Sequence, residues 1–412
     1  MLPAAGAHTH DGSCAAGCDH DAAPALIPGP LALYIHIPWC VRKCPYCDFN
    51  SHQRPSELPV ADYVAALVRD LEFDLPNVWG RTVHSVFFGG GTPSLFPAAA
   101  INDILAACSA RLRFAPGAEV TLECNPGTAE FDRFEGYRAA GVNRLSFGVQ
   151  SFDDGCLRAL GRIHDSGEAE RAVKLAQDAG LTNLNIDLMY ALPEQTMAMA
   201  LHDVERAVAL QPAHLSHYHL TMEPNTVFAA RPPQGLPDED DAWAMQEACQ
   251  QRIGDAGFAH YEISAYAKPG RQCQHNLAYW TYADYLGIGA GAHGKISFGF
   301  DGRVLRRWKK KNPREYLAAL APGAPDGAHV GGDEDVLLPA RPFDYMLNRL
   351  RLHAPFALSD FEQATGVSRA AIVSELAQAE DRGWLQGNGE VYALTAQGRN
   401  FNNDLVSLFL KD

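Results

Sequence analysis

Short apolar runs alternate with longer amphipathic segments through the first half of the chain. The runs have the length and composition of buried β-strands, and the segments between them have helical periodicity or consist of good helix formers. Strands are predicted at residues 31–37, 85–88, 119–123, 144–149, 183–189 and 214–220, and helices at 60–75, 101–112 and 169–179. A strand and a helix repeated six times predict parallel strands joined by right-handed crossovers. The fold class is therefore predicted to be α/β, with a partial (β/α)6 TIM-like barrel.

The pattern changes near Arg341 to short helices followed by a hairpin. Asn388 and Gly389 supply the turn between predicted strands at 384–386 and 391–394. This order predicts a small winged-helix-like α+β domain at the C-terminus. The predicted domains are a barrel core at 31–225, a region that completes the barrel at 226–335, and the C-terminal domain at 336–412.

The first 30 residues are rich in Ala, Gly, Pro and Asp and show neither helical nor strand periodicity. This composition predicts a disordered tail at 1–30. Cys and His side chains at short separations can also bind zinc or haem iron, although nothing around them in the sequence would preorganise such a site. The residues concerned are His8, His10, Cys14, Cys18 and His20.

Acidic residues outnumber basic ones, 49 to 34, which gives a formal net charge of -15. Nucleic-acid binding depends on clustered Lys and Arg, so a nucleic-acid partner is not expected. No apolar run approaches the roughly 20 residues needed to span a bilayer, and any membrane contact is expected to be peripheral. The cysteines are irregularly spaced in a long chain without a signal peptide, which predicts a reducing, cytoplasmic location.

Three cysteines, Cys40, Cys44 and Cys47, follow the first predicted strand at C-x3-C-x2-C spacing. Thiolates this close together suit zinc, copper(I) or an iron–sulfur cluster. A structural zinc site would add a fourth Cys or His, and only His52 follows at short range. A cluster held by three cysteines instead keeps one iron free to bind a small molecule. The spacing favours a cluster, with zinc and unliganded core thiols as the alternatives.

With Tyr46 before its last cysteine, the motif resembles the C-x3-C-x-aromatic-C signature of the radical S-adenosylmethionine (SAM) superfamily. That resemblance implies a 4Fe-4S cluster whose free iron binds SAM, and one electron from the cluster then cleaves SAM to a 5′-deoxyadenosyl radical. More narrowly, residues 34–52, YIHIPWCVRKCPYCDFNSH, resemble the HemW family of haem chaperones, which is related to the HemN family of oxygen-independent coproporphyrinogen III oxidases. The resemblance extends from about residue 31 to the C-terminus.

Further candidate residues lie where the predicted strands end, which is where such barrels place their chemistry. Glycines in the sequence GGGTP at 89–93 let the backbone approach a ligand closely. Glu123 can accept hydrogen bonds from the ribose or amino group of SAM, and the neighbouring Cys124 is predicted to be a buried apolar thiol. By resemblance, the expected SAM contacts also include Tyr34, Gly90, Gly91, Thr92, Gln150, Arg162 and Asp187.

A second motif, QHNLAYW, occupies residues 274–280. On a helix, His275 and Tyr279 share a face, and these residues taken alone predict an aromatic core cluster. The motif also resembles the H-N-x-x-Y-W haem-binding motif of the HemW family. That resemblance implies haem contacts at His275, Asn276, Tyr279 and Trp280.

The basic run RRWKKK at 306–311 is predicted to be a solvated turn. The alternatives are contact with haem propionates, with an acidic partner or with anionic lipid.

The sequence leaves three candidate functions. The first is a haem chaperone that delivers haem to respiratory acceptor proteins and takes electrons from a reductant such as flavodoxin or ferredoxin. The second is an oxygen-independent coproporphyrinogen III dehydrogenase, and the third is radical SAM modification of RNA. Phe49 stands where HemN has a further cysteine, and the tail leaves no room for the N-terminal segment that helps HemN hold substrate. The net charge and the lack of an RNA-binding module disfavour the third.

Overall fold

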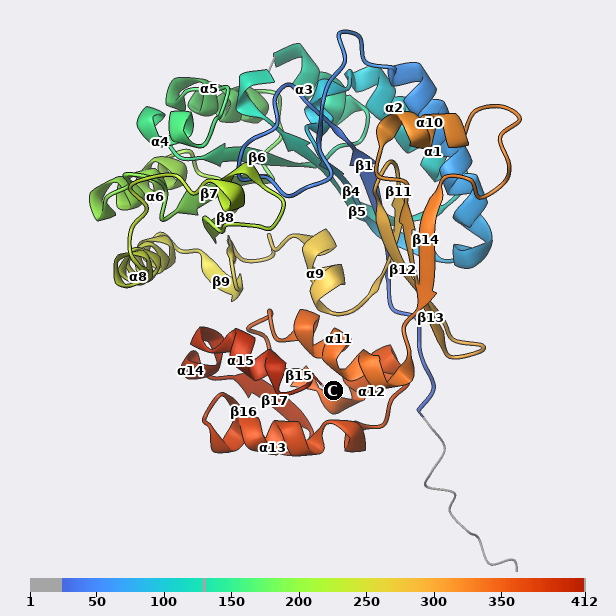
Figure 1. Ribbon diagram of the computed structural model, residues 1–412, viewed down its shortest axis with the longest axis vertical. Helices are drawn as coiled ribbons and strands as arrows, with labels where there is room; N and C mark the ends of the chain where they lie inside the picture. Colours follow the sequence, from blue (N-terminus) through green and yellow to red (C-terminus); the bar gives the residue numbers. More distant parts are fainter. Residues whose placement is uncertain (1–23, 129–130, 411–412) are drawn as a thin grey trace, which may run out of the picture.

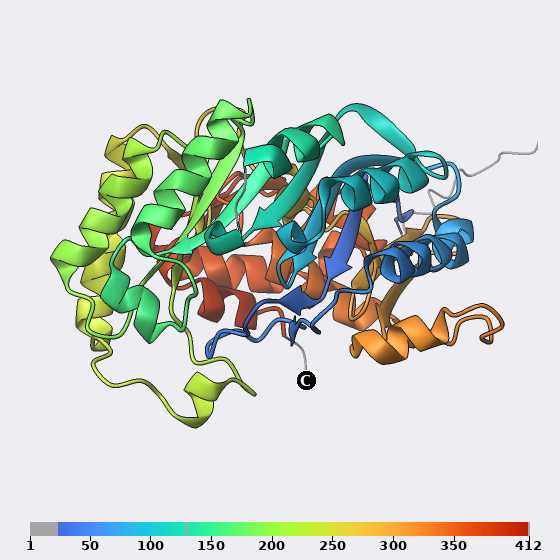
Figure 2. The same ribbon diagram turned by 90° about the horizontal axis from the view of Figure 1, so that it is seen from above.

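The computed structural model describes residues 24–128 and 131–410. The predicted Cys and His site in the tail lies outside the described residues. The described chain forms one large open sheet with helices along its outer side and a smaller C-terminal unit beneath it (Figures 1 and 2). Within the described ranges, none of the helices is both long enough and apolar enough to cross a membrane.

Six neighbouring strands of the large sheet pair in parallel and follow the chain order. Each coincides with a strand predicted from the sequence, which confirms the α/β fold class and its parallel barrel. The first of them is almost continuously apolar and buried, as expected for a parallel strand covered on both faces. The strands are β1 (Leu31–Ile37), β4 (Thr82–Gly90), β5 (Arg113–Cys124), β6 (Arg144–Gln150), β7 (Leu184–Tyr190) and β8 (His214–His219).

Helices connect these strands and cover the outer side of the sheet (Figure 1). Local sequence sets several of their beginnings: Asp165 caps one helix and forms a reciprocal capping box with Glu168. Their apolar faces join the strands in one continuous core. The helices are α1 (Val60–Asp74), α2 (Ala98–Ser109), α3 (Phe131–Ala139), α4 (Asp154–Ala159), α5 (Ser166–Asp178), α6 (Met197–Ala209), α7 (Val227–Ala230) and α8 (Glu239–Asp255).

The sheet continues beyond the predicted barrel on both sides. A seventh parallel strand, β11 (Asp284–Ile288), pairs with β1, so β1 lies inside the sheet. Antiparallel strands extend the sheet from β11, and two more lie beside β8. These strands are β12 (His293–Phe298), β13 (Arg303–Lys309), β14 (Val330–Asp335), β9 (Ala259–Glu262) and β10 (Ala265–Ala267), with α10 (Pro313–Ala319) after β13.

The prediction of a solvated turn at 306–311 is wrong, because most of this run belongs to β13. Lys309 is buried and pairs with Asp70 and Asp74 at 2.5 Å each. Arg307 pairs with Asp74 at 2.6 Å, and Arg306 pairs with Asp344. The run therefore fastens the sheet extension to α1 and to the C-terminal unit.

The C-terminal unit has a hydrophobic core of its own, which includes Tyr345, Phe361 and Leu376. The predicted hairpin is confirmed, since its two strands pair antiparallel around Asn388 and Gly389. A third short strand adds to the hairpin. The elements are α11 (Arg341–Arg349), β15 (Phe356–Ala357), α12 (Leu358–Thr365), α13 (Val373–Asp381), β16 (Leu385–Gly387), β17 (Val391–Leu394), α14 (Ala396–Asn400) and α15 (Asn402–Ser407).

Candidate functional site

The three-cysteine loop is fixed to the carboxyl end of the parallel sheet. After β1 the chain forms β2 (Trp39–Cys40), which pairs in parallel with β3 (His52–Gln53) across the base of the loop. The amide of Arg54 donates to the carbonyl of Cys40 at 2.8 Å. The end of β4 holds the other side, since the amide of Thr92 donates to the carbonyl of Trp39 at 2.8 Å. The cysteines therefore lie on a loop braced by two neighbouring strand ends.

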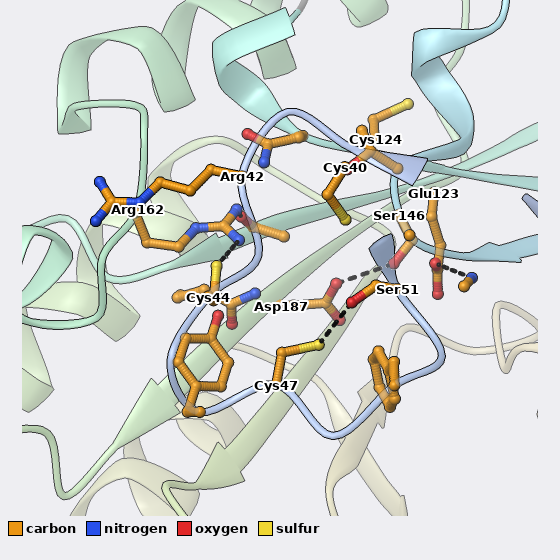
Figure 3. A pocket seen from close by; sticks show the side chains of 18 residues that line it. Cys40, Arg42, Cys44, Cys47, Ser51, Glu123, Cys124, Ser146, Arg162 and Asp187 are labelled. Carbon is orange, nitrogen blue, oxygen red and sulfur yellow. Dashed lines mark hydrogen bonds between the residues drawn. The ribbon is translucent and has the colours of Figure 1, made fainter. Parts of the chain in front are cut away.

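The thiols of Cys40, Cys44 and Cys47 face a common pocket (Figure 3). They are half-buried, whereas the other cysteines of the described chain are buried, and all of them are free. In the same part of the chain, no three His, Cys, Asp or Glu side chains converge on a single-ion site. One zinc ion would need its sulfur ligands about 2.3 Å from a single point. Three thiols that face one pocket suit an iron–sulfur cluster, which cysteine thiolates hold.

The pocket has a volume of about 150 Å³ and gathers residues from β4, β5, β6 and β7. It brings together every residue predicted for the cluster and for SAM except Tyr34. Cys124, predicted to be a buried thiol, is buried and also lines the pocket. The predicted residues that line it are Cys40, Cys44, Tyr46, Cys47, Gly90, Gly91, Thr92, Glu123, Gln150, Arg162 and Asp187.

Tyr34 lies one layer behind this pocket. Its hydroxyl is 3.0 Å from Nδ1 of His36, and its ring packs on Phe87. It lines an adjoining cavity of about 600 Å³, which also borders Gly90 and Glu123. Tyr34 is thus a neighbour of the cysteine pocket and not part of its wall.

Two carboxylates, Glu123 and Asp187, line the same pocket as the three thiols (Figure 3). Glu123 accepts a hydrogen bond from the amide of Gly90 at 3.2 Å. Burial, and secondly the charge of Asp187, raise the pKa of Glu123 to about 8. Asp187 accepts hydrogen bonds from the Tyr218 hydroxyl at 2.9 Å and from the Ser146 hydroxyl at 3.1 Å, yet burial still raises its pKa.

Neither carboxylate belongs to a salt bridge among the described residues, although Arg162 lines the same pocket. Burying a carboxylate without a cationic partner is costly. A ligand that brings positive charge into the pocket would lower that cost. The amino group and sulfonium of SAM carry such charge, so the carboxylates suit this ligand.

Arg162 connects the fourth strand to the cysteine loop. It donates to the Gly148 carbonyl and, from Nη1, to the Sγ of Cys44 at 3.7 Å. Burial opposes its charge, but Tyr46 and Cys44 outweigh burial and raise its pKa. The adjacent Gln150 has a left-handed backbone with φ 73°, a conformation uncommon outside glycine. The end of β6 is thus shaped to direct polar groups into the pocket.

The glycines of the GGGTP segment serve internal packing as well as access. A Cβ on Gly90, whose φ is +111°, would lie 2.4 Å from Cε1 of His36. A Cβ on Gly91 would lie 2.6 Å from the carbonyl oxygen of Trp39. Side chains here would push the cysteine loop off the sheet. The glycines are therefore required for packing of the cysteine loop against the sheet, in addition to the role in ligand approach that the sequence predicts.

The second motif forms α9 (Gln274–Trp280), which packs under the barrel opening (Figure 1). His275 is 1% exposed; its Nδ1 lies 3.1 Å from the Ser85 hydroxyl and its Nε2 lies 3.1 Å from the Tyr279 hydroxyl. Its ring stacks on Phe87, and burial lowers its pKa to about 3. Both ring nitrogens are engaged, so His275 cannot bind iron in this conformation. The geometry matches the aromatic core cluster that the residues alone predict.

The other motif residues reach different surroundings. Asn276 lines a cavity of about 670 Å³ that adjoins the cysteine pocket, and Tyr279 lines the cavity next to Tyr34. The indole of Trp280 lies against the guanidinium of Arg351, 4.2 Å from its ring centre. The motif therefore lies between the 670 Å³ cavity, which Asn276 lines, and the 600 Å³ cavity, which Tyr279 lines.

The 670 Å³ cavity also contains residues that the sequence did not single out. His219 and Tyr218 lie at the carboxyl end of β8, where the barrel rule alone could have marked them. Phe49 is 62% exposed and borders this cavity and the cysteine pocket. The residues missed are Arg144, Met189, Tyr218, His219 and Arg351.

Comparison with solved structures and family models agrees with this geometry. Residues 34–207 match the model of the radical SAM superfamily, and residues 338–401 match the HemN C-terminal domain. The fold resembles coproporphyrinogen III oxidase (HemN) from Escherichia coli, described as a radical SAM enzyme. The TM-score is 0.78 at 24% identity, over 92% of this chain and 90% of that one.

Sequence relatives narrow the assignment further. The protein named heme chaperone HemW from Escherichia coli (strain K12) is 48% identical, over 93% of this chain and 99% of the relative. Heme chaperone HemW from Haemophilus influenzae is 46% identical, over 93% and 98%. A Mycobacterium tuberculosis protein of the same name is 33% identical over 94% and 98%. This chain belongs to the HemW family of the radical SAM superfamily.

Proposed function

We propose that this protein is a haem chaperone that holds haem near an iron–sulfur cluster and SAM and passes the haem to acceptor proteins. One observation carries the proposal: the 48% identical relative named heme chaperone HemW is matched over 99% of its length. Phe49, in the position of the additional HemN cysteine, favours carriage of haem over oxidation of coproporphyrinogen III.

The cysteine pocket is the proposed cofactor site. Cys40, Cys44 and Cys47 would hold the 4Fe-4S cluster, which in this superfamily supplies the electron that cleaves SAM. Glu123 and Asp187 would face the positive charge of SAM, for the electrostatic reason given above. The remaining proposed SAM contacts are Tyr34, Tyr46, Gly90, Gly91, Thr92, Gln150 and Arg162.

The 670 Å³ cavity beside the cluster is the proposed haem site. It offers apolar surface at Phe49 and a cationic group at Arg144, which suit a flat macrocycle with propionates, whereas the nearby Arg351 is already paired with Glu262 at 3.2 Å. His219 supplies an imidazole with no hydrogen-bond partner in the described part of the chain. The motif at 275–280 would support this cavity from behind, with Asn276 in its wall.

The cysteines of the described chain are all free, in keeping with a reducing cytoplasm. The barrel and the C-terminal unit have separate cores, with Tyr282 alone of the earlier residues packed in the C-terminal core, and this supports a domain boundary near residue 336, with the barrel at 31–225 and its completion at 226–335. Respiratory acceptors and a flavodoxin or ferredoxin reductant remain the proposed partners.

A peripheral membrane contact loses the support of Arg306, Arg307 and Lys309, which are engaged in ion pairs.

The direct test uses anaerobically purified protein with its cluster reconstituted. We expect haem titration to give saturable binding and the haem-loaded protein to transfer haem to an apo-acceptor. Incubation with coproporphyrinogen III, SAM and a reductant should leave the porphyrinogen unchanged. Robust protoporphyrinogen formation would overturn the chaperone assignment.

The same haem titration, carried out with variants, tests whether His219 or His275 contacts the haem. His219→Ala is expected to change the absorption spectrum of the bound haem, because it removes an imidazole that faces the cavity. His275→Gln should leave the spectrum unchanged, since that ring faces Ser85 and Tyr279. The opposite pattern would show that the 275–280 motif rearranges to bind iron.

A further inference from the structure

The outside of the cysteine loop carries positive charge, although the chain as a whole has a net charge of -15. Besides Arg42, which lines the cysteine pocket, four exposed cationic side chains belong to two segments that are far apart in the sequence, residues 41–57 and 310–315. We call this set the basic collar. It consists of Lys43, Arg54, Lys311 and Arg314.

Hydrogen bonds and shared cavities bring these two segments together. The side chain of Asn50 donates to the Lys311 carbonyl at 3.0 Å. Lys43 and Lys311 line the same cavity, and Arg54 and Arg314 line a second one. The collar is therefore one surface around the loop.

The collar is close to the cysteines. The Arg54 amide bonds the Cys40 carbonyl at 2.8 Å, and the cavity bordered by Lys43 and Lys311 includes Cys47. Residues that would hold a cluster therefore lie beside the collar.

The collar charges are not neutralised within the molecule. No collar residue forms a salt bridge among the described residues, and the Lys43 ammonium donates only to the Phe49 carbonyl at 3.1 Å. The nearby acids are Asp48, Glu57 and Glu315, which are fewer than the cations. The contrast with the neighbouring Lys309 is informative, because Lys309 is buried between two aspartates.

We propose that the basic collar docks an acidic one-electron carrier protein of the flavodoxin or ferredoxin class. The inference rests on the proposed function, which requires that the cluster be reduced. One electron passes from the reduced carrier to the cluster, and no covalent bond forms or breaks. Complementary charge around a redox centre accelerates association and makes it dependent on ionic strength.

The test compares two variants with the same change in net charge. Both are measured with reduced flavodoxin as the protein donor and with dithionite as a small donor, by the bleaching of cluster absorbance. Arg42 is left intact because it lines the cysteine pocket. The collar variant carries Lys43→Glu, Arg54→Glu, Lys311→Glu and Arg314→Glu; the control carries Arg113→Glu, Arg171→Glu, Arg271→Glu and Arg399→Glu, which are exposed elsewhere.

We expect the rate of reduction by flavodoxin to fall about tenfold or more in the collar variant at low salt, as for other steered associations. The control should keep at least most of the wild-type rate, and both should react normally with dithionite. Binding of flavodoxin to the cluster-free proteins is measured by interferometry. The collar variant should bind more weakly than the wild type and the control variant. These readouts do not involve haem, so they are independent of the haem assignment.

An equal loss in both variants would overturn the collar as a specific site and leave only net charge. An unchanged rate in the collar variant would do the same. Binding of anionic phospholipid vesicles that requires the collar, with flavodoxin reduction unaffected, would assign the surface to a membrane instead.

Discussion

Two pairs of carboxylates, one buried and one half-buried, lie on either side of β1 and behave in opposite ways. Asp70 and Asp74 on α1 share the ammonium of Lys309, at 2.5 Å each. Glu123, at the end of β5, and Asp187, in the middle of β7, have no such cation among the described residues. The protein supplies a cation to the first pair, which is called the balanced pair below. Within the described chain it supplies no cation to the second pair.

The surroundings of Asp70 explain this difference. Burial by itself would raise its pKa, but Lys309 and His329 together outweigh burial and the pKa is lowered. The Tyr316 hydroxyl also donates to Asp70 at 2.7 Å, and the Gly289 amide donates at 2.9 Å. Every contact stabilises the ionised form. Such a pair serves to hold α1, β11 and β13 together.

Around Glu123 the protein supplies only the Gly90 amide, and the neighbouring Asp187 adds repulsion. A buried charge that the protein leaves unbalanced marks a site for a ligand of opposite charge. The comparison therefore separates structural carboxylates from binding carboxylates within one sheet.

The largest expected effect is on the balanced pair. Lys309→Met should destabilise the protein by about 3 kcal/mol, because it removes the buried cation that Asp70 and Asp74 share and leaves only Arg307 beside Asp74 and His329 beside Asp70. Lys310→Met, at the next position, is the control and should change stability by less than about 0.5 kcal/mol. Denaturant unfolding of both variants measures the difference. Equal stability of the two would mean that Asp70 and Asp74 do not depend on Lys309.

A smaller effect, on the order of a few kcal/mol, is expected for Glu123→Gln in cofactor-free protein. The folded pKa of Glu123, about 8, lies above its ordinary value of 4.5. The unfolded chain therefore loses this proton first, and wild-type stability falls as the pH rises from 4.5 to about 8. Glu123→Gln removes that loss, so its advantage should grow over this window.

Asp70 should titrate with the opposite sign. The folded pKa of Asp70 is lowered below its ordinary 3.8, so its stabilisation is complete above that value and is lost as the pH falls further. Thermal unfolding of wild type, Glu123→Gln and Asp70→Asn should be followed from below pH 3.8 to above pH 8. It measures whether stability falls at low pH because of Asp70 and at high pH because of Glu123. Parallel profiles for the two variants would remove the distinction between the pairs.

The smallest effect concerns the hydrogen bond from Arg162 to Cys44. Hydrogen bonds to cluster sulfurs help to set the reduction potential. Arg162→Gln should therefore shift the potential of the reconstituted cluster to a more negative value while the iron content stays the same. Arg158→Gln, an exposed neighbour, serves as the control in redox titration followed by electron paramagnetic resonance.

Much of the barrel was predictable because each strand carries its own apolar run. The cysteine pocket was predictable as well, since parallel strands bring their carboxyl ends together. The seventh strand was missed because 284–288 is short and precedes a glycine-dense stretch. The burial of Lys309 was not predictable, because its partners lie more than 230 positions away in the sequence.

His275 shows a different limit. Its spacing to Tyr279 predicted packing, whereas resemblance to a motif predicted a haem contact. The structure pairs its ring with Ser85, which is 190 positions away in the sequence. Local spacing could not reveal that partner, and so could not show that both nitrogens are occupied.

The central claim is that Glu123 and Asp187 remain unbalanced in order to meet a cationic ligand. Calorimetry of SAM binding to the cluster-loaded protein at pH 7, in buffers of different ionisation enthalpy, tests it most directly. A cationic ligand should expel the proton from Glu123, whose pKa is about 8. The account predicts proton release on binding to wild type and its absence in Glu123→Gln. Identical proton release by the two proteins, or none by wild type, would contradict it.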